Sequence, residues 1–143
     1  MSGGMELYLH MPFCVRKCAY CDFLSFPTDQ ETQNLYTRRL REDIDAMGKK
    51  YGDIPVDTIF IGGGTPSVPD SALIVGIMEH VRKAFHVAEG AEISMEANPG
   101  TVTREKLTDY RRAGINRLSF GLQSANDREL KLLGRIHTWA EFL

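Results

Sequence analysis

The stretch LYLHMPFCVRKCAYCDF, residues 7–23, decides the fold and the chemistry of this 143-residue chain. Its first five residues are apolar-rich and predict a β-strand at residues 7–11. The strand runs directly into a loop with all three cysteines of the chain, Cys14, Cys18 and Cys21, at C-x3-C-x2-C spacing. A closed structural metal site takes four protein ligands, so a loop with three thiols needs an explanation.

The composition around this loop is that of an ordinary globular domain. Hydrophobic residues make up 43% of the chain and charged residues 25%, which suits one domain with a real core. A net charge of -2 without a basic block gives no reason to expect nucleic acid. No signal peptide or membrane span is expected from the apolar pattern, so the cytoplasm is the expected compartment. Clustered cysteines there favour metal or redox chemistry over disulfides.

Strand and helix signals alternate along the chain. Further strands are expected at residues 56–61, 92–96 and 117–123. Helix starts are expected at a capping box of Thr28 and Glu31 and at Ser67 and Asp70. A third helix is expected to begin near Thr103 and end at Gly114, and a fourth begins with residues 124–133. The repeated β-α units predict an α/β fold with a parallel sheet, either open and doubly wound or curled into a barrel.

Apolar periodicity indicates which side of each element is buried. The helices carry apolar faces made of Tyr36, Leu40, Ile44 and Met47, then Leu73, Ile74, Ile77, Met78, Val81 and Phe85, then Leu107 and Tyr110. Three strands have one oily face, with Leu7, Leu9 and Met11, with Ile93 and Met95, and with Leu118, Phe120 and Leu122. Their other faces carry Tyr8 and His10, Ser94 and Glu96, and Ser119, Gly121 and Gln123. Both faces of a doubly wound sheet are buried, so this alternation favours a curled sheet with a polar interior.

Two metal sites are compatible with the cysteine spacing. His10 could complete a Cys3His zinc site with the three cysteines. Alternatively, the three thiolates bind three irons of a four-iron iron–sulfur cluster and leave the fourth iron open for a substrate or cofactor. The second reading gives a chemical reason for a loop with three cysteines.

Other polar groups are expected at the carboxyl ends of the strands. GGGTP, residues 62–66, follows the second strand, and its glycines would let the backbone approach a ligand and expose N–H and C=O groups. A plain strand-to-helix turn is the alternative, and the missing Lys-Ser or Lys-Thr excludes a P-loop. Glu96 and Gln123 end the third and fourth strands, and each could instead be a satisfied core group. Parallel α/β proteins place their sites at this edge.

The ordered set C-x3-C-x2-C, GGGTP, EANPG and GLQS resembles the radical S-adenosylmethionine (SAM) enzymes, in the branch of oxygen-independent coproporphyrinogen III oxidases and HemW-like heme chaperones. The resemblance implies a partial (β/α)6 barrel. Residues 1–143 would form its first four β-α units, as the N-terminal part of a radical SAM core domain. It also implies a 4Fe-4S cluster whose open iron binds SAM, and cleavage of SAM to methionine and a 5′-deoxyadenosyl radical.

The resemblance assigns roles to individual residues. Cys14, Cys18 and Cys21 would be the cluster ligands, with Tyr8 and Tyr20 beside the cluster and SAM. The SAM contacts would come from Gly63, Gly64, Thr65, Glu96, Gln123 and Arg135, with the glycines acting through their backbone.

One departure from the oxidases bears on function. They carry a further cysteine two places after the third, where this chain has Phe23, as HemW-like members do. The expected role is therefore a heme chaperone that passes heme to an acceptor protein and receives electrons from a donor protein. A coproporphyrinogen oxidase and a Cys3His zinc module are the alternatives. The remaining barrel strands and the heme-binding residues are expected outside these 143 residues, and the last strand would offer an edge for association.

Overall fold

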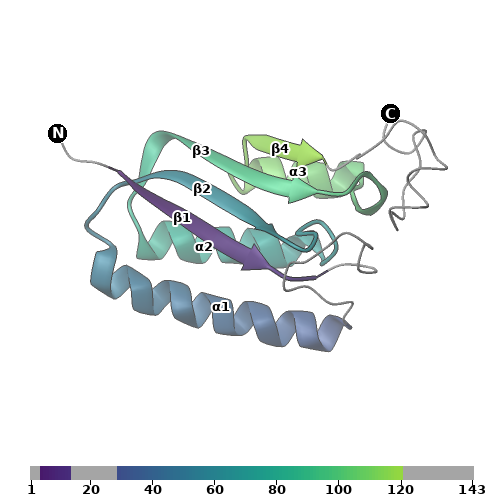
Figure 1. Cartoon of the computed structure of the whole chain (residues 1–143), viewed down its shortest axis with the longest axis horizontal. Helices are drawn as coiled ribbons and strands as arrows, with labels where there is room; N and C mark the ends of the chain where they lie inside the picture. Colours follow the sequence, from purple (N-terminus) through teal and green to yellow (C-terminus); the bar gives the residue numbers. More distant parts are fainter. Residues whose placement is uncertain (1–3, 14–28, 121–143) are drawn as a thin grey trace.

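Four parallel strands form a single sheet in a computed structural model that describes residues 4–13 and 29–120. The strands are β1 (Met5–Met11), β2 (Val56–Gly63), β3 (Val87–Ala97) and β4 (Arg117–Phe120), and they lie in chain order (Figure 1). Each strand pairs in parallel with the next. All four predicted strands are confirmed in position within the described residues, and β1 and β3 begin earlier than expected. Residues 121–123 of the fourth predicted strand and the predicted helix at residues 124–133 lie outside the described part of the chain.

The helices lie on one side of this sheet. They are α1 (Gln30–Tyr51), α2 (Ser71–Ala84) and α3 (Arg104–Arg112), with a short 3-10 turn η1 (Pro99–Thr101) before α3. Crossovers between parallel strands are right-handed, so strands in chain order put every connecting helix on the same face. Figure 1 shows this arrangement, in which α2 packs against both α1 and α3. A doubly wound sheet would reverse its strand order, and the predicted barrel-like winding is confirmed.

The core lies between the sheet and the helices. Its sheet side consists of Leu9, Met11, Ile59, Ile61, Ile93 and Met95, each at most 5% exposed. Its helix side includes Ile44, Ile74, Ile77, Met78, Val81 and Tyr110. The period-2 and period-3.6 patterns therefore predicted most of the core correctly.

Three residues expected in the core are exposed. Met47 is 50% exposed because the buried stripe of α1 passes through Gly48, where an added Cβ would lie 2.6 Å from Ala84 of α2. Leu107 is 37% exposed, since Tyr110 is the residue of α3 that enters the core. Phe120 is 39% exposed at the end of β4, which pairs with β3 along one side in the described part of the chain.

Two predicted helix starts need correction. The N-cap of α1 is Asp29, whose carboxylate accepts the backbone N–H of Thr32 at 2.8 Å and whose pKa this bond lowers. The predicted cap, Thr28, lies outside the described residues. Asp70 caps α2 as expected, by accepting the N–H of Ala72 at 3.1 Å. Ser67 does not open this helix, because its side chain is fully buried and bonds to the loop after β3.

The end of α3 and the start of β4 are held by local hydrogen bonds. Gly114 has a φ of 101°, and the N–H groups of Gly114 and Ile115 return to the carbonyls of Arg111 and Tyr110, which makes a Schellman motif. The predicted helix end at Gly114 is thereby confirmed.

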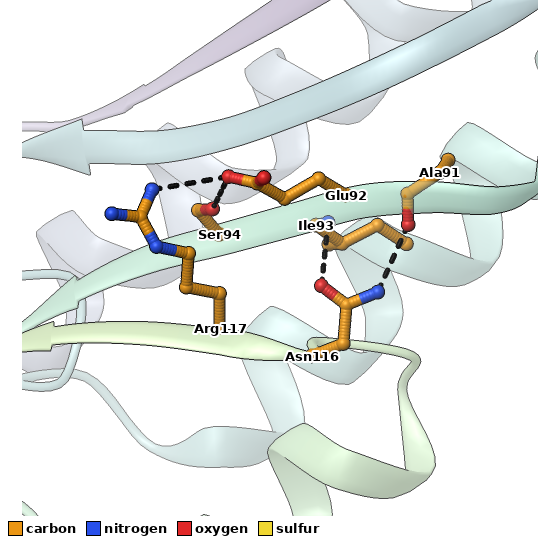
Figure 2. Close-up of polar contacts among 6 residues, drawn as sticks. All are labelled: Ala91, Glu92, Ile93, Ser94, Asn116 and Arg117. Atoms are coloured by element: carbon orange, nitrogen blue, oxygen red, sulfur yellow. Dashed lines mark hydrogen bonds and ion pairs between the residues drawn. The ribbon is translucent and has the colours of Figure 1, made fainter.

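The next residue joins β4 to β3. Asn116 donates its side-chain amide to Ala91 and accepts the N–H of Ile93, each at 2.9 Å (Figure 2). Beside it, the Arg117 guanidinium lies 3.1 Å from the Glu92 carboxylate. These contacts hold the start of β4 in register with β3.

Candidate functional site

The face of the sheet opposite the helices, here called the open face, gathers polar and aromatic side chains toward the carboxyl ends of β1, β2 and β3. Tyr8 pairs in register with Phe60, and His10 pairs with Gly62. Ser94 lies opposite Phe60, so Glu96, two residues further along β3, points to the same face. The pleat of parallel strands thus brings Tyr8, His10, Phe60 and Glu96 together, although they are far apart in sequence.

Aromatic rings form the floor of this site. The rings of Tyr8 and Phe60 stack at 5.9 Å between centroids and 14° between planes. The hydroxyl of Tyr8 lies 3.2 Å from Nδ1 of His10, and the side chain of Tyr8 is 58% exposed. A Cβ at Gly62 would lie only 2.6 Å from the Phe60 ring, so a larger residue there would have to displace the ring that stacks on Tyr8. A flat or cationic ligand would find aromatic surface here.

Glu96 supplies the negative charge of the site. Burial raises the pKa of its carboxyl group above the ordinary value, while the backbone N–H of Gly63 and the charge of His10 act in the opposite direction. Burial raises the pKa of Tyr8, and the charge of the Glu96 carboxylate raises it further, which places the two side chains within electrostatic range. A half-buried carboxylate of this kind suits a cationic partner such as an ammonium group.

The glycine loop after β2 is bonded to the chain that leads to the cysteines. The N–H of Gly64 donates to the carbonyl of Met11 at 3.0 Å, and the N–H of Thr65 donates to the carbonyl of Phe13 at 2.5 Å. An added Cβ at Gly64 would lie 2.5 Å from the Phe13 oxygen. The loop was expected to offer N–H groups to a ligand, but those of Gly64 and Thr65 are already bonded within the protein.

Helix α1 holds the same segment from the other side. The Tyr36 hydroxyl donates to the backbone carbonyl of His10 at 2.5 Å, and burial raises the pKa of this tyrosine. The ring of Tyr36 meets that of Phe13 edge-on, with centroids 5.3 Å apart. Phe13 is fully buried, so the residue before Cys14 is fixed by the glycine loop and by α1.

Several predicted site residues lie outside the described part of the chain. They are the cysteines Cys14, Cys18 and Cys21, and also Tyr20, Gln123 and Arg135. Their roles stay predictions. Within residues 4–13 and 29–120, no three His, Cys, Asp or Glu side chains gather as a metal site. None of the helices in those ranges is long and apolar enough to cross a membrane.

Sequence reasoning missed two members of this region. Phe60 was passed over because β2 is apolar on both faces, although its alternation with Ile59 and Ile61 places it on the open face beside Tyr8. Lys106, which joins the loops after β2 and β3, had no local signal, because its partners lie up to 39 residues away.

Comparison with known proteins agrees with this arrangement. The sequence model of the Radical SAM superfamily matches residues 8–143. The heme chaperone HemW of Escherichia coli is 45% identical over 139 residues, which cover 93% of this chain and 35% of HemW. The mitochondrial radical S-adenosyl methionine domain-containing protein 1 of Bos taurus is 36% identical over 137 residues, which cover 96% of this chain and 31% of that protein.

A solved structure gives the same fold. Coproporphyrinogen III oxidase (HemN) from Escherichia coli, described as a radical SAM enzyme, superposes with a TM-score of 0.91 at 30% identity and covers 98% of this chain. This chain covers 32% of the oxidase. It thus spans about a third of the length of the relatives it matches.

Proposed function

Because the chain belongs to the radical SAM superfamily, we propose that Cys14, Cys18 and Cys21 hold a 4Fe-4S cluster and that the open face binds SAM beside it. When bound, the cluster supplies an open iron for the amino acid part of SAM and an electron for its sulfonium. Three thiolates leave one iron without a protein ligand. The residues of the open face have the complementary chemistry.

The observation that carries this proposal is the grouping of Tyr8, Gly63 and Glu96 directly beside the entry to the cysteine loop. Glu96 offers a half-buried carboxylate to the ammonium group of SAM. The stacked rings of Tyr8 and Phe60 offer a surface for the sulfonium or for the adenine. Phe13, held by Thr65 and Tyr36, fixes the backbone position from which Cys14 starts.

For the wider role we propose a heme chaperone that hands heme to an acceptor protein in the cytoplasm, with a separate protein as electron donor. The HemW proteins of Escherichia coli and Haemophilus influenzae support this, at 45% and 41% identity. Phe23 supports it as well, since it stands where the oxidases carry a cysteine. Residues outside these 143 would contribute the heme contacts and the rest of the barrel.

A coproporphyrinogen oxidase is the second candidate, favoured by the TM-score of 0.91 with HemN. The two candidates differ in what happens to the tetrapyrrole. Incubation of a longer protein that includes the rest of the barrel with SAM, a reductant and either heme or coproporphyrinogen should show stoichiometric heme binding and no loss of carbon dioxide. Release of carbon dioxide from coproporphyrinogen would select the oxidase instead.

Metal analysis tests the cluster. Anaerobic reconstitution with iron and sulfide should load about four irons per chain with broad visible absorption. Cys14→Ala, Cys18→Ala or Cys21→Ala should each lose most of the iron, whereas His10→Ala should keep it. Stoichiometric zinc that depends on His10 would replace the cluster by a Cys3His zinc site.

SAM binding is tested on the reduced cluster. Addition of SAM should change the electron paramagnetic resonance spectrum, because the ligand occupies the open iron. Glu96→Gln should weaken this binding and keep the iron content. An unchanged spectrum at saturating SAM would contradict the proposed site.

A further inference from the structure

A partly buried polar cluster joins the loops that follow β2 and β3, on the α3 side of the site. Its centre is Lys106 of α3, whose ammonium group donates to the carbonyls of Ser67 at 2.6 Å and of Thr101 at 3.0 Å. The carbonyl of Val68 is a third, longer contact at 3.5 Å. One side chain thereby bonds to the loop after β2 and to the loop after β3.

A second set of bonds closes the same junction. The Ser67 hydroxyl accepts the backbone N–H of Asn98 at 3.1 Å and makes a short hydrogen bond with the Thr101 hydroxyl. The Asn98 side chain accepts the N–H of Gly100 at 2.9 Å, which shapes the turn around it. Ser67 is fully buried and Asn98 is 6% exposed, so water does not replace these bonds.

The charge of Lys106 suits this position. Three carbonyl oxygens need three donors, which only the protonated ammonium group has. Burial lowers the pKa of Lys106, and the nearby carboxylate of Asp70 acts to raise it. Neutral carbonyl oxygens hold the ammonium group, and its removal would leave partly buried acceptors without this donor.

The junction lies close to the candidate site along both loops. The loop after β2 reaches Ser67 four residues after Gly63, and the loop after β3 reaches Asn98 two residues after Glu96. The backbone N–H of Gly63 acts to lower the pKa of Glu96, which places the two groups close together. The distance between the two loops therefore bears directly on where the carboxylate of Glu96 lies.

We propose that Lys106 is a positioning residue, which holds the loops after β2 and β3 together and so sets the place of Glu96 against Gly63. This inference rests on the proposed function where it concerns SAM. The part that concerns the two loops does not depend on any cofactor.

The first test needs neither cluster nor SAM. In Lys106→Met, which keeps the apolar stem and removes the donors, the amides of Gly63, Asn98 and Thr101 should exchange with deuterium at least tenfold faster. The amides of Leu9 and Ile59 at the centre of the sheet should keep their rates. Lys83→Met is the matched control, because Lys83 is exposed on α2, and it should change none of these rates.

The second test measures SAM. In the reconstituted full chain, Lys106→Met should weaken SAM binding about tenfold at unchanged iron content. In a Glu96→Gln background the same substitution should have a much smaller effect, because its effect passes through Glu96. Lys106→Arg, which keeps charge and donors, should recover part of the affinity. If Lys106→Met does not fold, Lys106→Gln, which retains two donors, takes its place.

The outcomes separate the two proposals. Unchanged exchange at Gly63 and Asn98 would overturn the positioning role, whatever SAM does. Equal effects of Lys106→Met on SAM in the wild-type and Glu96→Gln backgrounds would also overturn it. Failure of the unaltered protein to bind SAM would overturn the proposed function, while the exchange result would still decide whether Lys106 holds the loops.

Discussion

The two faces of the sheet are made from alternate residues of the same strands, yet they differ in how exposed their side chains are and in how polar they are. On the helix-covered face Leu9, Ile61 and Met95 are at most 5% exposed and belong to the hydrophobic core. On the open face Tyr8 is 58% exposed, and Glu96 is half-buried with a raised pKa. The covered face supplies stability, while the open face holds the candidate chemistry. On each strand, substitutions on the helix-covered face should therefore lower stability, whereas substitutions on the open face should change ligand binding.

The largest loss of unfolding free energy is expected for truncations on the helix-covered face. Ile61→Ala removes a side chain that is 1% exposed, and such truncations cost about 2–5 kcal/mol of unfolding free energy because a cavity remains. Urea denaturation followed by circular dichroism measures this. A cost no greater than that of an exposed substitution such as Lys83→Met would show that the covered face does not dominate stability.

A smaller loss of unfolding free energy is expected for substitutions where the glycine loop contacts the segment before Cys14. Gly64→Ala places a Cβ 2.5 Å from the Phe13 carbonyl, and the backbone shift needed costs about 1–3 kcal/mol. Phe13 precedes the first cysteine, so iron loading should fall as well.

Gly90→Ala is the control for this prediction. A Cβ at Gly90 meets nothing within 4 Å, although its φ of 84° also disfavours alanine. This variant should lose some stability and keep its iron. Equal iron loss in both variants would mean that the contact of Gly64 with Phe13 does not position the cysteine loop.

The two carboxylates of β3, Glu92 and Glu96, should make stability depend on pH in opposite directions. Burial raises the pKa of Glu96, so its protonation favours the folded state, and this stability is lost as pH rises through the raised pKa. Glu96→Gln should remove that loss, which makes the variant more stable than the wild type at neutral pH by less than about 1 kcal/mol for a half-exposed group.

Glu92 lies on the same face four residues earlier and should show the opposite sign. Hydrogen bonds from Ser94 and Arg117 lower its pKa, so its contribution is present above the ordinary pKa and is lost as pH falls. Thermal melts of Glu96→Gln and Glu92→Gln between acid and neutral pH measure both slopes. The same sign for the two variants would contradict the difference in their surroundings.

The smallest effect is expected at Tyr8. Tyr8→Phe removes the hydroxyl near His10 and keeps the stacked ring, so unfolding free energy should change by less than about 0.5 kcal/mol, as for other exposed sites. Tyr8→Ala removes the ring and should weaken SAM binding more than Tyr8→Phe does. Equal SAM affinity in both variants would show that the aromatic floor does not contact the ligand.

Local patterns predicted the elements of this fold well. Strand positions followed from runs of apolar and β-branched residues, and Asp70, Thr103 and Gly114 marked helix ends through bonds within one turn. The errors have a common origin. Ser67 was assigned to a helix start because its true partners, at Asn98 and Thr101, are 31 or more residues away. Such pairs leave no periodic trace in the sequence.

The sequence by itself determined the winding of the chain, the apolar face of three of the four strands and the spacing of the three cysteines, because these depend on local periodicity and spacing. Only the tertiary structure decided how the site is held together. Register between β1, β2 and β3 set Tyr8 against Phe60 and Glu96 near Gly63. The N–H groups of Gly64 and Thr65 turned toward the chain before Cys14, and Lys106 joined two loops. These contacts depend on distances between segments remote in sequence, which become defined when the helices pack on one face of the sheet.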